Sequence, residues 1–433
     1  MEIRDPVHGS IDINDLFIPV ITHPFFQRLR GIKQLGFSDF AFPGATHTRY
    51  LHSIGVMHIG RKVFEKIFRK HSPSSELNRL RETLTMACLL HDIGHAPLSH
   101  STESVMPNLS KLDLPNRFND SSSDRQATHE DYTIKAIVDS EFTQSFELLR
   151  KEFGVDPNCI AELITGETKD PDYFKLDGVN YFPVLHQMVS SEMDCDRMDY
   201  LLRDSYFCGV SYGQYDLDWI IDNLGTGIYQ GNAHLGISER AVATFDDFLL
   251  SRFHMFMMVY FHYRAVCMEK MLEKYFQEAR TEYSIPHNIE EYQKHDDNFL
   301  IKVLKDSQNG WAQRVLNNNI PLKVLEIFGE GQRPKMDRLK SYLDSQQIDA
   351  IVCSSVGRLS KYYRPGENQS PKFPMLMIRS FLEQSQSQYM PIDEATVIFK
   401  KFSQVHSVER IHFDFYQLPD KNRDEILAII GEE

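Results

Sequence analysis

The stretch that decides the fold is Ala87-Cys88-Leu89-Leu90-His91-Asp92-Ile93-Gly94-His95, an apolar run that ends in a His-Asp doublet. Leu80 to His91 predicts a buried helix that ends near Gly94. A buried His-Asp pair costs desolvation free energy unless it is paired or bound to a cation. Taken alone, however, the doublet is more typical of an ordinary helix end, where His and Gly are both favoured.

Motifs on two other predicted helices change that interpretation. His52 falls on the first turns of a helix predicted from near Thr48 to Arg69, and Asp196 lies in an acidic cluster within a helix predicted over Pro183 to Asp204. With His91 and Asp92 they supply imidazoles and carboxylates from three separate helices. Such mixed nitrogen and oxygen ligation suits one divalent ion among Mn, Fe, Co, Ni, Zn and Mg. It would leave positions for water and a phosphate oxygen.

Other helices are expected through the first 285 residues. Residues 107–128, rich in Asn, Ser and Asp, predict a loop, and Ser10 to Ile13 predicts part of a small strand pair. The apolar run from Phe245 to Ala279 predicts one long helix, whose Met and aromatic side chains we interpret as a core face or a subunit interface. One further helix is predicted to open at His23-Pro24 and to carry Phe26, Leu29, Ile32 and Leu35. Two others are predicted over Glu130–Val138 and Pro157–Thr165.

After residue 285 the character of the sequence changes. A charged helix is predicted over Pro334–Ser345, and runs typical of strands follow it. We therefore expect a fold that is mainly α, with residues 1–285 forming a helical core and residues 286–433 a smaller C-terminal α+β lobe. The predicted strands are Ala350–Cys353, Pro374–Ile378, Ala395–Phe399 and Ile411–Phe415.

Six motifs in this order resemble one known family. His…His-Asp…Asp is the pattern of the HD domain, and the surrounding residues look like those of the HD-domain deoxynucleoside triphosphate (dNTP) triphosphohydrolases, which include SAM- and HD-domain proteins of animals. The resemblance covers roughly residues 1–270, and no SAM domain precedes the HD region in this sequence. The motifs are Asp5–Gly9, Phe26–Leu35, Phe42–Ser53, His91–His100, Thr128–Glu130 and Asp196–Asp204.

The resemblance implies a role for each matching residue. His52, His91, Asp92 and Asp196 would hold the metal ion, and Asp194 would lie behind or beside it, or on a solvated helix face. Additional histidines would protonate the leaving oxygen and neutralise phosphate charge. These catalytic residues are His95, His100, His129 and Glu103, of which His100 and Glu103 are spaced as neighbours on a helix. The substrate-binding residues are Gln34, Leu35, Arg49, Arg197, Tyr200, Asp204, His262 and Arg264.

The sequence departs from the family pattern at several positions. Arg197 stands where the family has Lys, and Val266-Cys267 replaces a Tyr-Gln pair that faces the sugar and base. The nucleotide regulatory site matches only in part, because Arg4 and Thr22 stand where Asn and Asp would read guanine. We therefore do not predict activation by GTP, although Gln27 and Arg30 match that site.

The implied function is hydrolysis of dNTPs to a deoxynucleoside and triphosphate, by metal-activated water that attacks the α-phosphorus. A second Mg ion could arrive with the nucleotide. Two alternatives stay open: an HD-type phosphatase for nucleoside mono- or diphosphates or cyclic nucleotides, and a non-catalytic nucleotide sensor. The intact His-Asp set argues against the sensor, because a structural site needs no open positions.

Composition narrows the partners. The formal net charge of −14 argues against general binding of nucleic acid, because a phosphate backbone must be neutralised by Lys and Arg. The six Cys form no CxxC pair, so neither a zinc ribbon nor a disulfide framework is predicted. No apolar signal or membrane segment is expected, and the protein is interpreted as cytoplasmic. A homo-oligomer, dimer or tetramer, is expected through the apolar residues 245–279.

Overall fold

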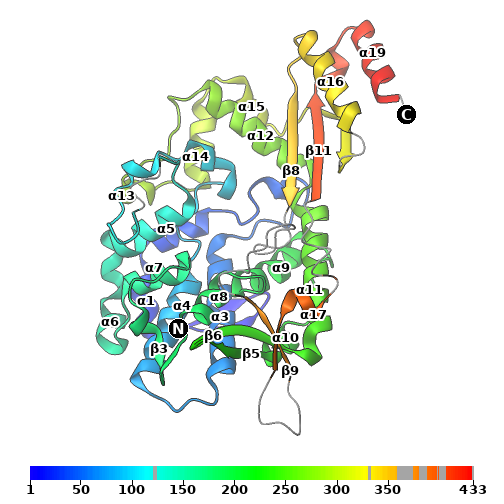
Figure 1. The fold of residues 1–433 in the computed structure, drawn as a ribbon. Coiled ribbons are helices and arrows are strands. Elements are labelled where there is room, and N and C mark those ends of the chain that lie inside the picture. The colour runs from blue at the N-terminus through cyan, green and yellow to red at the C-terminus, as the bar shows by residue number, and fades with distance from the viewer. Residues whose placement is uncertain are drawn as a thin grey trace.

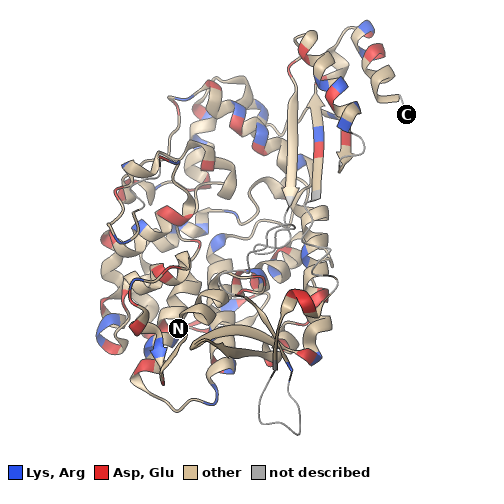
Figure 2. Cartoon of the chain, viewed as in Figure 1, with Lys and Arg blue, Asp and Glu red and all other residues tan. Residues whose placement is uncertain are grey.

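The computed structural model describes residues 1–119, 124–329, 333–357, 374–379, 388–396, 398 and 406–431. Helices dominate these residues, which confirms the predicted mainly α class. Figure 1 shows a large helical body and a small lobe that projects from it and carries the C-terminus. Acidic and basic residues are interspersed along the helices in Figure 2, and both signs occur on the helices of the lobe.

The centre of the body is a packed pair of helices, α3 (Arg49–Phe68) and α4 (Ser75–Leu90). Helix α3 agrees with its predicted bounds to within one residue at each end, and its apolar face is buried. Ser74 caps the start of α4, because its hydroxyl accepts a hydrogen bond from the Leu77 amide at 3.1 Å. This pair places His52 and His91 within the same buried region.

The other helices of the body surround this pair. They are α1 (Ile18–Thr22), α2 (Pro24–Gln27), α5 (His129–Val138), α6 (Glu147–Phe153), α7 (Pro157–Thr165), α8 (Phe182–Val189), α9 (Cys195–Cys208), α10 (Leu217–Asn223), α11 (Val242–Met255), α12 (Tyr263–Glu278), α13 (Ile289–Tyr292), α14 (Asp297–Asp306) and α15 (Gly310–Leu316). Short 3₁₀ helices join them: η1 (Asp15–Phe17), η2 (Arg28–Gly31), η3 (Gly36–Phe40), η4 (Ser99–Val105), η5 (Leu109–Lys111), η6 (Glu141–Phe146), η7 (Pro171–Phe174), η8 (Glu239–Ala241) and, in the lobe, η10 (Phe415–Gln417).

Predictions of continuous helices were wrong where a capping residue or a turn interrupts the chain. The helix predicted over Pro183–Asp204 ends at Val189, and α9 begins after Asp194, whose carboxylate accepts from the amide of Arg197 at 2.8 Å. The helix predicted over Phe245–Ala279 is divided by the π-helical turn η9 (Phe256–Tyr260).

One shorter prediction also needs correction. The helix that opens at Pro24 becomes 3₁₀ and ends at Gly31, because Ile32 is extended. The described residues of the loop predicted over 107–128 are irregular apart from η5, and Leu109, Leu112 and Leu114 anchor them in the core. Residues 120–123 of that loop lie outside the described part.

The body also carries two small sheets. The expected N-terminal hairpin is present as β1 (Glu2–Asp5) and β2 (Gly9–Asp12), paired antiparallel. A six-stranded sheet has the order β10-β9-β6-β4-β3, with β5 beside β6. The hairpin β5-β6 was not predicted, and β9, predicted as a strand of the lobe, pairs instead with β6. These strands are β3 (Lys175–Leu176), β4 (Val179–Asn180), β5 (Leu224–Tyr229), β6 (Asn232–Ser238), β9 (Leu376–Arg379) and β10 (Gln388–Pro391).

The lobe is an antiparallel sheet of order β7-β11-β8, made of β7 (Leu322–Phe328), β11 (His406–Phe413) and β8 (Ile351–Gly357). Helices α16 (Arg333–Ser345) and α19 (Asp420–Gly431) pack with it around a small second core. Helices α13–α15 belong to the core of the body, whereas the division at residue 285 stays a prediction. Of the strand predicted over Ala395–Phe399, Ala395 ends the helical turn α17 (Ile392–Ala395), and residues 397 and 399 lie outside the described part.

Candidate active site

The predicted metal ligands converge where α4 ends. His52 comes from the second turn of α3, His91 follows the last residue of α4, and Asp196 lies in the first turn of α9. The Oδ1 atom of Asp196 lies 3.0 Å from Nε2 of His52 and 3.5 Å from Nε2 of His91. Asp92 joins them, with Oδ2 3.6 Å from Nε2 of His52.

Hydrogen bonds on the far side of each ring orient the two imidazoles. Nδ1 of His52 lies 2.8 Å from Asp199, and Nδ1 of His91 lies 2.9 Å from the carbonyl oxygen of Cys88. Both acceptors require the proton on Nδ1, so the Nε2 lone pairs face the centre. Neither Nε2 atom has a hydrogen-bond partner within the described residues. A buried nitrogen left in this way is costly unless a ligand satisfies it, so the group fits a divalent cation.

The electrostatics of the group agree with that fit. Burial would lower the pKa of His52, but Asp196 and Asp199 outweigh it and raise the pKa to about 9. Burial likewise opposes protonation of His91, but Asp92 and Asp196 raise its pKa to about 10. The surplus of carboxylate charge that favours protons here favours a divalent cation equally.

Asp199, which the sequence-based assignment omitted, supports His52 from behind. Its carboxylate lies 2.8 Å from His52 Nδ1 and 2.6 Å from His8 Nε2, and it accepts from Arg203 Nε at 2.7 Å. Arg203 in turn donates to Asp5 at 2.8 Å. All of these side chains are buried, so Asp199 is part of a closed network rather than a surface carboxylate.

One sequence signal could have identified Asp199. It follows Asp196 by three residues, so both lie on one face of α9. It also faces Gly55 of α3, where a Cβ atom would collide with the Asp199 and Arg203 side chains. The glycine therefore permits the close approach of α3 and α9 that the site requires.

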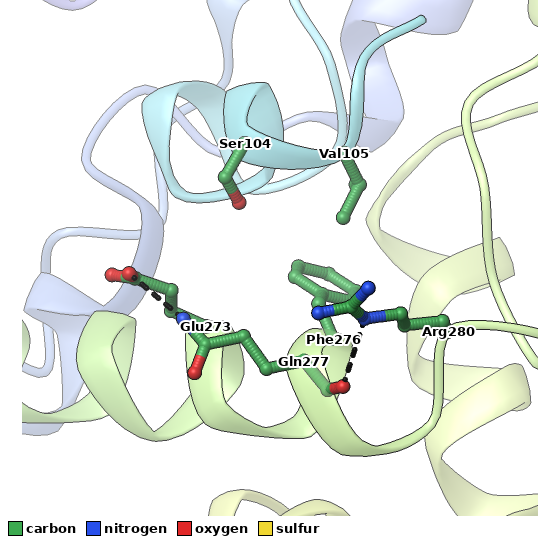
Figure 3. A pocket seen from close by; sticks show the side chains of 6 residues that line it. All are labelled: Ser104, Val105, Glu273, Phe276, Gln277 and Arg280. Carbon is green, nitrogen blue, oxygen red and sulfur yellow. Dashed lines mark hydrogen bonds between the residues drawn. The ribbon is translucent and has the colours of Figure 1, made fainter.

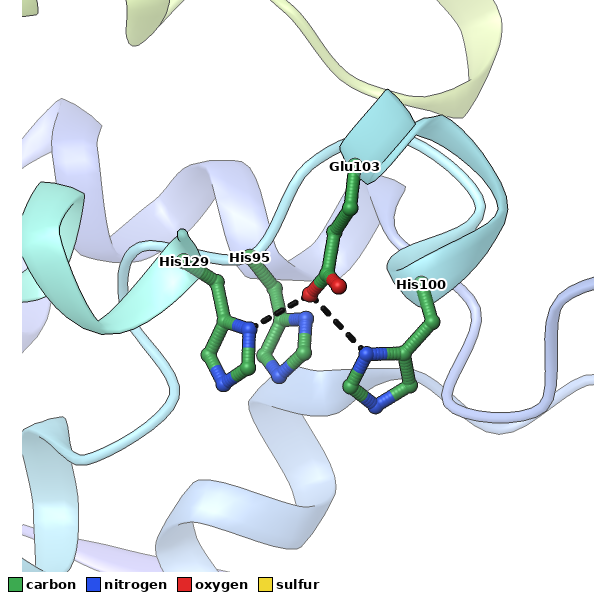
Figure 4. Close-up of side chains that lie close together, drawn as sticks. All are labelled: His95, His100, Glu103 and His129. Carbon is green, nitrogen blue, oxygen red and sulfur yellow. Dashed lines mark hydrogen bonds and ion pairs between the residues drawn. The ribbon is translucent and has the colours of Figure 1, made fainter. Parts of the chain in front are cut away.

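The predicted catalytic residues form a second group, drawn in Figure 4. Glu103 Oε1 lies between two rings, 2.9 Å from His100 Nδ1 and 2.6 Å from His129 Nδ1. The ring of His95 stacks on that of His129, with centroids 3.9 Å apart. Burial would raise the pKa of Glu103, but its bonds to His100 and His129 hold that pKa well below its usual value.

His95 connects the two groups. Its Nε2 atom lies 3.3 Å from Oδ1 of Asp92, and the side chain is buried. Burial, together with the nearby charges of Arg49 and His129, lowers the pKa of His95 well below its usual value, so this ring is neutral near pH 7. Arg49 forms an ion pair with Asp92 and donates from Nε to the Ser99 hydroxyl at 2.9 Å.

The loop between the two groups is held by side chains from other elements. Arg28 donates from Nη2 to the carbonyl oxygens of residues 93 and 95, each at 2.8 Å. Tyr292 of α13 donates to the carbonyl of Gly94 at 2.8 Å, and Asp297 of α14 accepts from the amide of Leu98 at 2.6 Å. The geometry of the loop thus depends on helices that are distant in the sequence. Tyr292, for example, lies 198 residues after Gly94.

The family model of the HD domain matches residues 49–204, and that of the HD associated region matches residues 220–319. The uncharacterized protein YwfO of Bacillus subtilis is 30% identical over 396 residues, which cover 84% of this chain and 82% of that protein. The chain belongs to the HD-domain family.

Further relatives agree with this assignment. The deoxynucleoside triphosphate triphosphohydrolase SAMHD1 of Gallus gallus is 27% identical over 360 residues, which are 78% of this chain but 57% of that protein. A hypothetical protein from Aquifex aeolicus has the same fold, with a TM-score of 0.73 at 25% identity over 98% of this chain and 99% of that chain. The resemblance drawn from the motifs is confirmed, and the HD domain with its His/Asp group makes this chain a metal-dependent phosphohydrolase.

Among the predicted substrate residues on α9, Arg197 and Asp204 already have polar partners, whereas the ring of Tyr200 meets that of Tyr260 edge-on. Arg197 is paired with Asp194, which is buried as the cap of α9 and does not lie on a solvated face. Asp204 lies 2.8 Å from His47 Nε2 and accepts from Tyr260 Oη at 2.8 Å. Each carboxylate oxygen keeps a second lone pair, so these bonds leave Asp204 able to accept another.

The remaining predicted contacts lie on two sides of the site. Gln34 and Leu35 precede η3, and the Gln34 amide donates to the His47 carbonyl at 3.0 Å, beside the start of α3. His262 caps α12 by accepting from the Arg264 amide at 3.4 Å, and its ring meets Phe42 edge-on. The structure therefore brings Gln34 close to the HD motifs, while His262 and Arg264 stand at the border with the lobe.

A pocket of about 260 Å³ lies behind η4, between Ser104 and Val105 and the side chains of α12 (Figure 3). It shares η4 with His100 and Glu103, but its lining residues include none of the predicted site residues. Of the helices that the structure describes, none is both long and apolar enough to cross a bilayer.

Proposed function

We propose that this HD-domain protein hydrolyses dNTPs to a deoxynucleoside and triphosphate, with His52, His91, Asp92 and Asp196 as the metal ligands. One observation carries the proposal: the His/Asp group and the Glu103-centred histidines are continuous, because His95 Nε2 lies 3.3 Å from Asp92 Oδ1. Hydrolysis of a phosphate ester requires charge neutralisation and a proton for the leaving oxygen, and the two groups offer these side by side.

The chain's own residues divide the work as follows. A divalent cation, when bound, supplies Lewis-acid activation of water and of a phosphate oxygen. His129 is held by Glu103 through Nδ1, so its opposite nitrogen, Nε2, is directed away from the carboxylate and can hand a proton to the leaving oxygen. His100 shares the same carboxylate and is the second candidate for this transfer. Arg49, beside Asp92, offers a positive charge to the α-phosphate.

The proposed reaction breaks the bond between the α-phosphorus and the 5′-oxygen. Water adds to the α-phosphorus, the 5′-oxygen takes the proton and leaves as the deoxynucleoside hydroxyl, and triphosphate is released intact. Arg49, His129 and Arg197 support this position of attack, since the resembling family uses the matching residues as α-phosphate contacts. Arg197 would need to exchange part of its pairing with Asp194 to do so.

A preference for deoxyribose over ribose is the next part of the proposal. Tyr200 and Asp204 match residues that pack on the sugar and accept from its 3′-hydroxyl, and a close-fitting ring leaves little room for a 2′-hydroxyl. An apolar pocket alone rejects an added hydroxyl poorly, by a factor on the order of 100. Val266-Cys267 replaces the Tyr-Gln pair of the family, and Cys267 is buried beside Cys353 and His412, so no base preference is proposed.

Hydrolysis in oxygen-18 water tests the proposal. We expect label in triphosphate and none in the deoxynucleoside when dATP is the substrate, with activity lost in His91→Ala. Orthophosphate as the first product would overturn attack at the α-phosphorus. Equal turnover of ATP and dATP would remove the sugar preference and leave the position of cleavage standing.

The same assay separates the alternatives. A panel of nucleoside mono-, di- and triphosphates and cyclic nucleotides, with Mn, Mg, Ni and Fe, identifies a different HD-type phosphatase by its products. Nucleotide binding without any turnover would indicate a sensor. A homo-oligomer, a nucleotide that brings its own Mg ion and a cytoplasmic location remain part of the proposal.

A further inference from the structure

A second group of metal-binding side chains lies where the body meets the lobe. Cys267 comes from α12, Cys353 from β8 and His412 from β11, and one ligand atom from each lies within 4.8 Å of the others. All of these side chains have 0% exposed surface. They are far apart in sequence and are brought together by the docking of the sheet on α12.

The sheet register explains why the lobe presents two of them together. Cys353 pairs with Arg410 across the antiparallel ladder, and His412 lies two residues further along β11. Because side chains alternate between the faces of a sheet, Cys353 and His412 share the face that packs on α12. Cys267 meets them from the helix.

His412 is oriented like a ligand. Its Nδ1 atom lies 3.3 Å from the carbonyl oxygen of Pro321, an acceptor that requires the proton on Nδ1. Its Nε2 atom is buried and has no hydrogen-bond partner among the described residues. A metal-ligating histidine typically donates its other ring nitrogen to a carboxylate or a backbone carbonyl.

The charges around the group permit thiolates. Arg410 and Lys323 are both paired with Glu326, at 2.5 and 2.9 Å, and Arg314 is paired with Asp414 at 2.8 Å, so none of them would repel a bound cation with its full charge. Two thiolates would balance the charge of a divalent ion in this closed region.

We propose that Cys267, Cys353 and His412 bind a zinc ion that fastens the C-terminal sheet to α12. Two sulfur ligands and an imidazole select a thiophilic ion, unlike the nitrogen and oxygen ligands of the HD site. Three protein ligands leave the fourth tetrahedral position for water.

The site would act on the enzyme through α12. Tyr263, at the first turn of this helix, stacks on His412 with centroids 6.2 Å apart, and its ring also contacts that of His262, tilted, at 4.8 Å. A zinc ion here would therefore hold the helix that carries His262 and Arg264 at a fixed distance from the lobe. Because the ion binds the folded chain, its removal lowers the thermal midpoint.

Metal analysis of the full chain tests the site. Protein purified with zinc supplied should retain one equivalent in His91→Ala, which lacks the HD metal, and lose it when Cys353→Ser is added. Cys208→Ser, a half-buried cysteine outside the group, is the matched control and should retain the zinc. Zinc that stays bound in a folded His91→Ala/Cys353→Ser protein would overturn the assignment.

Absorption by Co²⁺ bound in place of zinc supplies a second test, which can be made on the wild-type chain. Co²⁺ bound to thiolate gives a sulfur-to-metal charge-transfer band in the near ultraviolet, which the HD site, built from nitrogen and oxygen donors, does not produce. We expect this band in the reduced wild-type chain and in Cys208→Ser. A wild-type chain that shows no band and holds no zinc beyond the HD metal would overturn the proposal. So would loss of two of the six titratable thiols to a disulfide in freshly purified protein.

Discussion

His52 owes its orientation to a single carboxylate, that of Asp199 at 2.8 Å from Nδ1. Such a partner fixes the tautomer and the ring position of a metal ligand, and its loss typically costs 10- to 100-fold in metal affinity. We therefore expect Asp199→Asn to weaken binding of the HD metal by about 10- to 100-fold. Competition with a chelator measures this, and Asp218→Asn, an exposed carboxylate, is the control. Unchanged affinity in a folded Asp199→Asn protein would contradict a positioning role.

The ligands themselves should show a larger effect. His91→Ala or Asp92→Ala removes a donor from a group whose carboxylate and imidazole atoms lie 3.0 to 3.6 Å apart. We expect either variant to lose the HD metal and nearly all activity while the circular dichroism spectrum stays unchanged. Full occupancy and turnover in either variant would show that the ligand set is wrong.

The partly buried ring of His295 should make the free energy of unfolding depend on pH. Burial, reinforced by the charge of Arg28, lowers its pKa to about 4. In the unfolded chain His295 binds a proton below pH 6.5, whereas in the folded chain it binds one only below about pH 4. The free energy of unfolding therefore falls as the pH falls from 6.5 to about 4. At pH 5 the contribution of this one ring is about 1–2 kcal/mol.

Urea unfolding at pH 7 and pH 5 measures this effect. His295→Gln should lose less stability than the wild type between the two pH values, whereas the exposed His287→Gln should follow the wild type. An identical pH dependence in His295→Gln and wild type would mean that other groups control the acid sensitivity.

At the scale of elements, the interruption between α8 and α9 is what aims Asp196 at the site. Asp194 accepts from the amides of Arg197 and Ser191, each at 2.8 Å, and also pairs with the Arg197 guanidinium. Removing one partner of a buried ion pair costs about 3–5 kcal/mol. We expect Asp194→Ala to lose stability of that order.

The comparison that isolates this cap is Asp216→Ala at the start of α10. Asp216 also caps its helix, by accepting from the Trp219 amide at 2.9 Å, but it is exposed and should cost only about 1 kcal/mol. Urea unfolding of both variants gives the difference. An Asp194→Ala protein as stable as the wild type would show that the turn does not depend on this cap.

Local sequence patterns predicted elements well where one periodicity runs unbroken. Helix α7 agrees with its predicted bounds, α3 carries His52 as expected, and His91 directly follows the last residue of α4. The breaks at Asp194 and at residues 256–262 were missed, because apolar spacing continues through them and only the capping geometry reveals the turn.

The motif residues of the candidate site could be predicted from the sequence, whereas the residues that hold them in place could not. His52, His91, Asp92 and Asp196 could be chosen from their residue types and order. Contacts such as Tyr292 to Gly94, 198 residues apart, follow from tertiary packing that no local pattern encodes. The same holds for Cys267, Cys353 and His412, whose spacing resembles no metal motif.

At the scale of the whole molecule, the candidate site is supported by segments from outside the HD match. The HD match covers residues 49–204, yet Arg28, Tyr292 and Asp297 hold its central loop from outside that range. The lobe reaches the site from the other side, through the contact of His412 with Tyr263 on α12. Changes in either flanking region are therefore expected to act on the active site through position.

Self-association is the last property that this arrangement predicts. The π-helical turn between α11 and α12 leaves Met258 49% exposed, with Phe256 and Met257 half-buried beside it. Large apolar side chains grouped on a surface often mark an interface. We expect the chain to form a dimer or tetramer through this turn, and Met258→Glu to weaken it, because a carboxylate buried in an apolar contact loses its hydration.

Leu427→Glu, which changes a leucine 55% exposed on α19, should leave the assembly intact. Size-exclusion chromatography with light scattering, with and without dATP, decides between them. A wild-type chain that stays monomeric at micromolar concentration under both conditions would show that this turn does not form an interface between subunits.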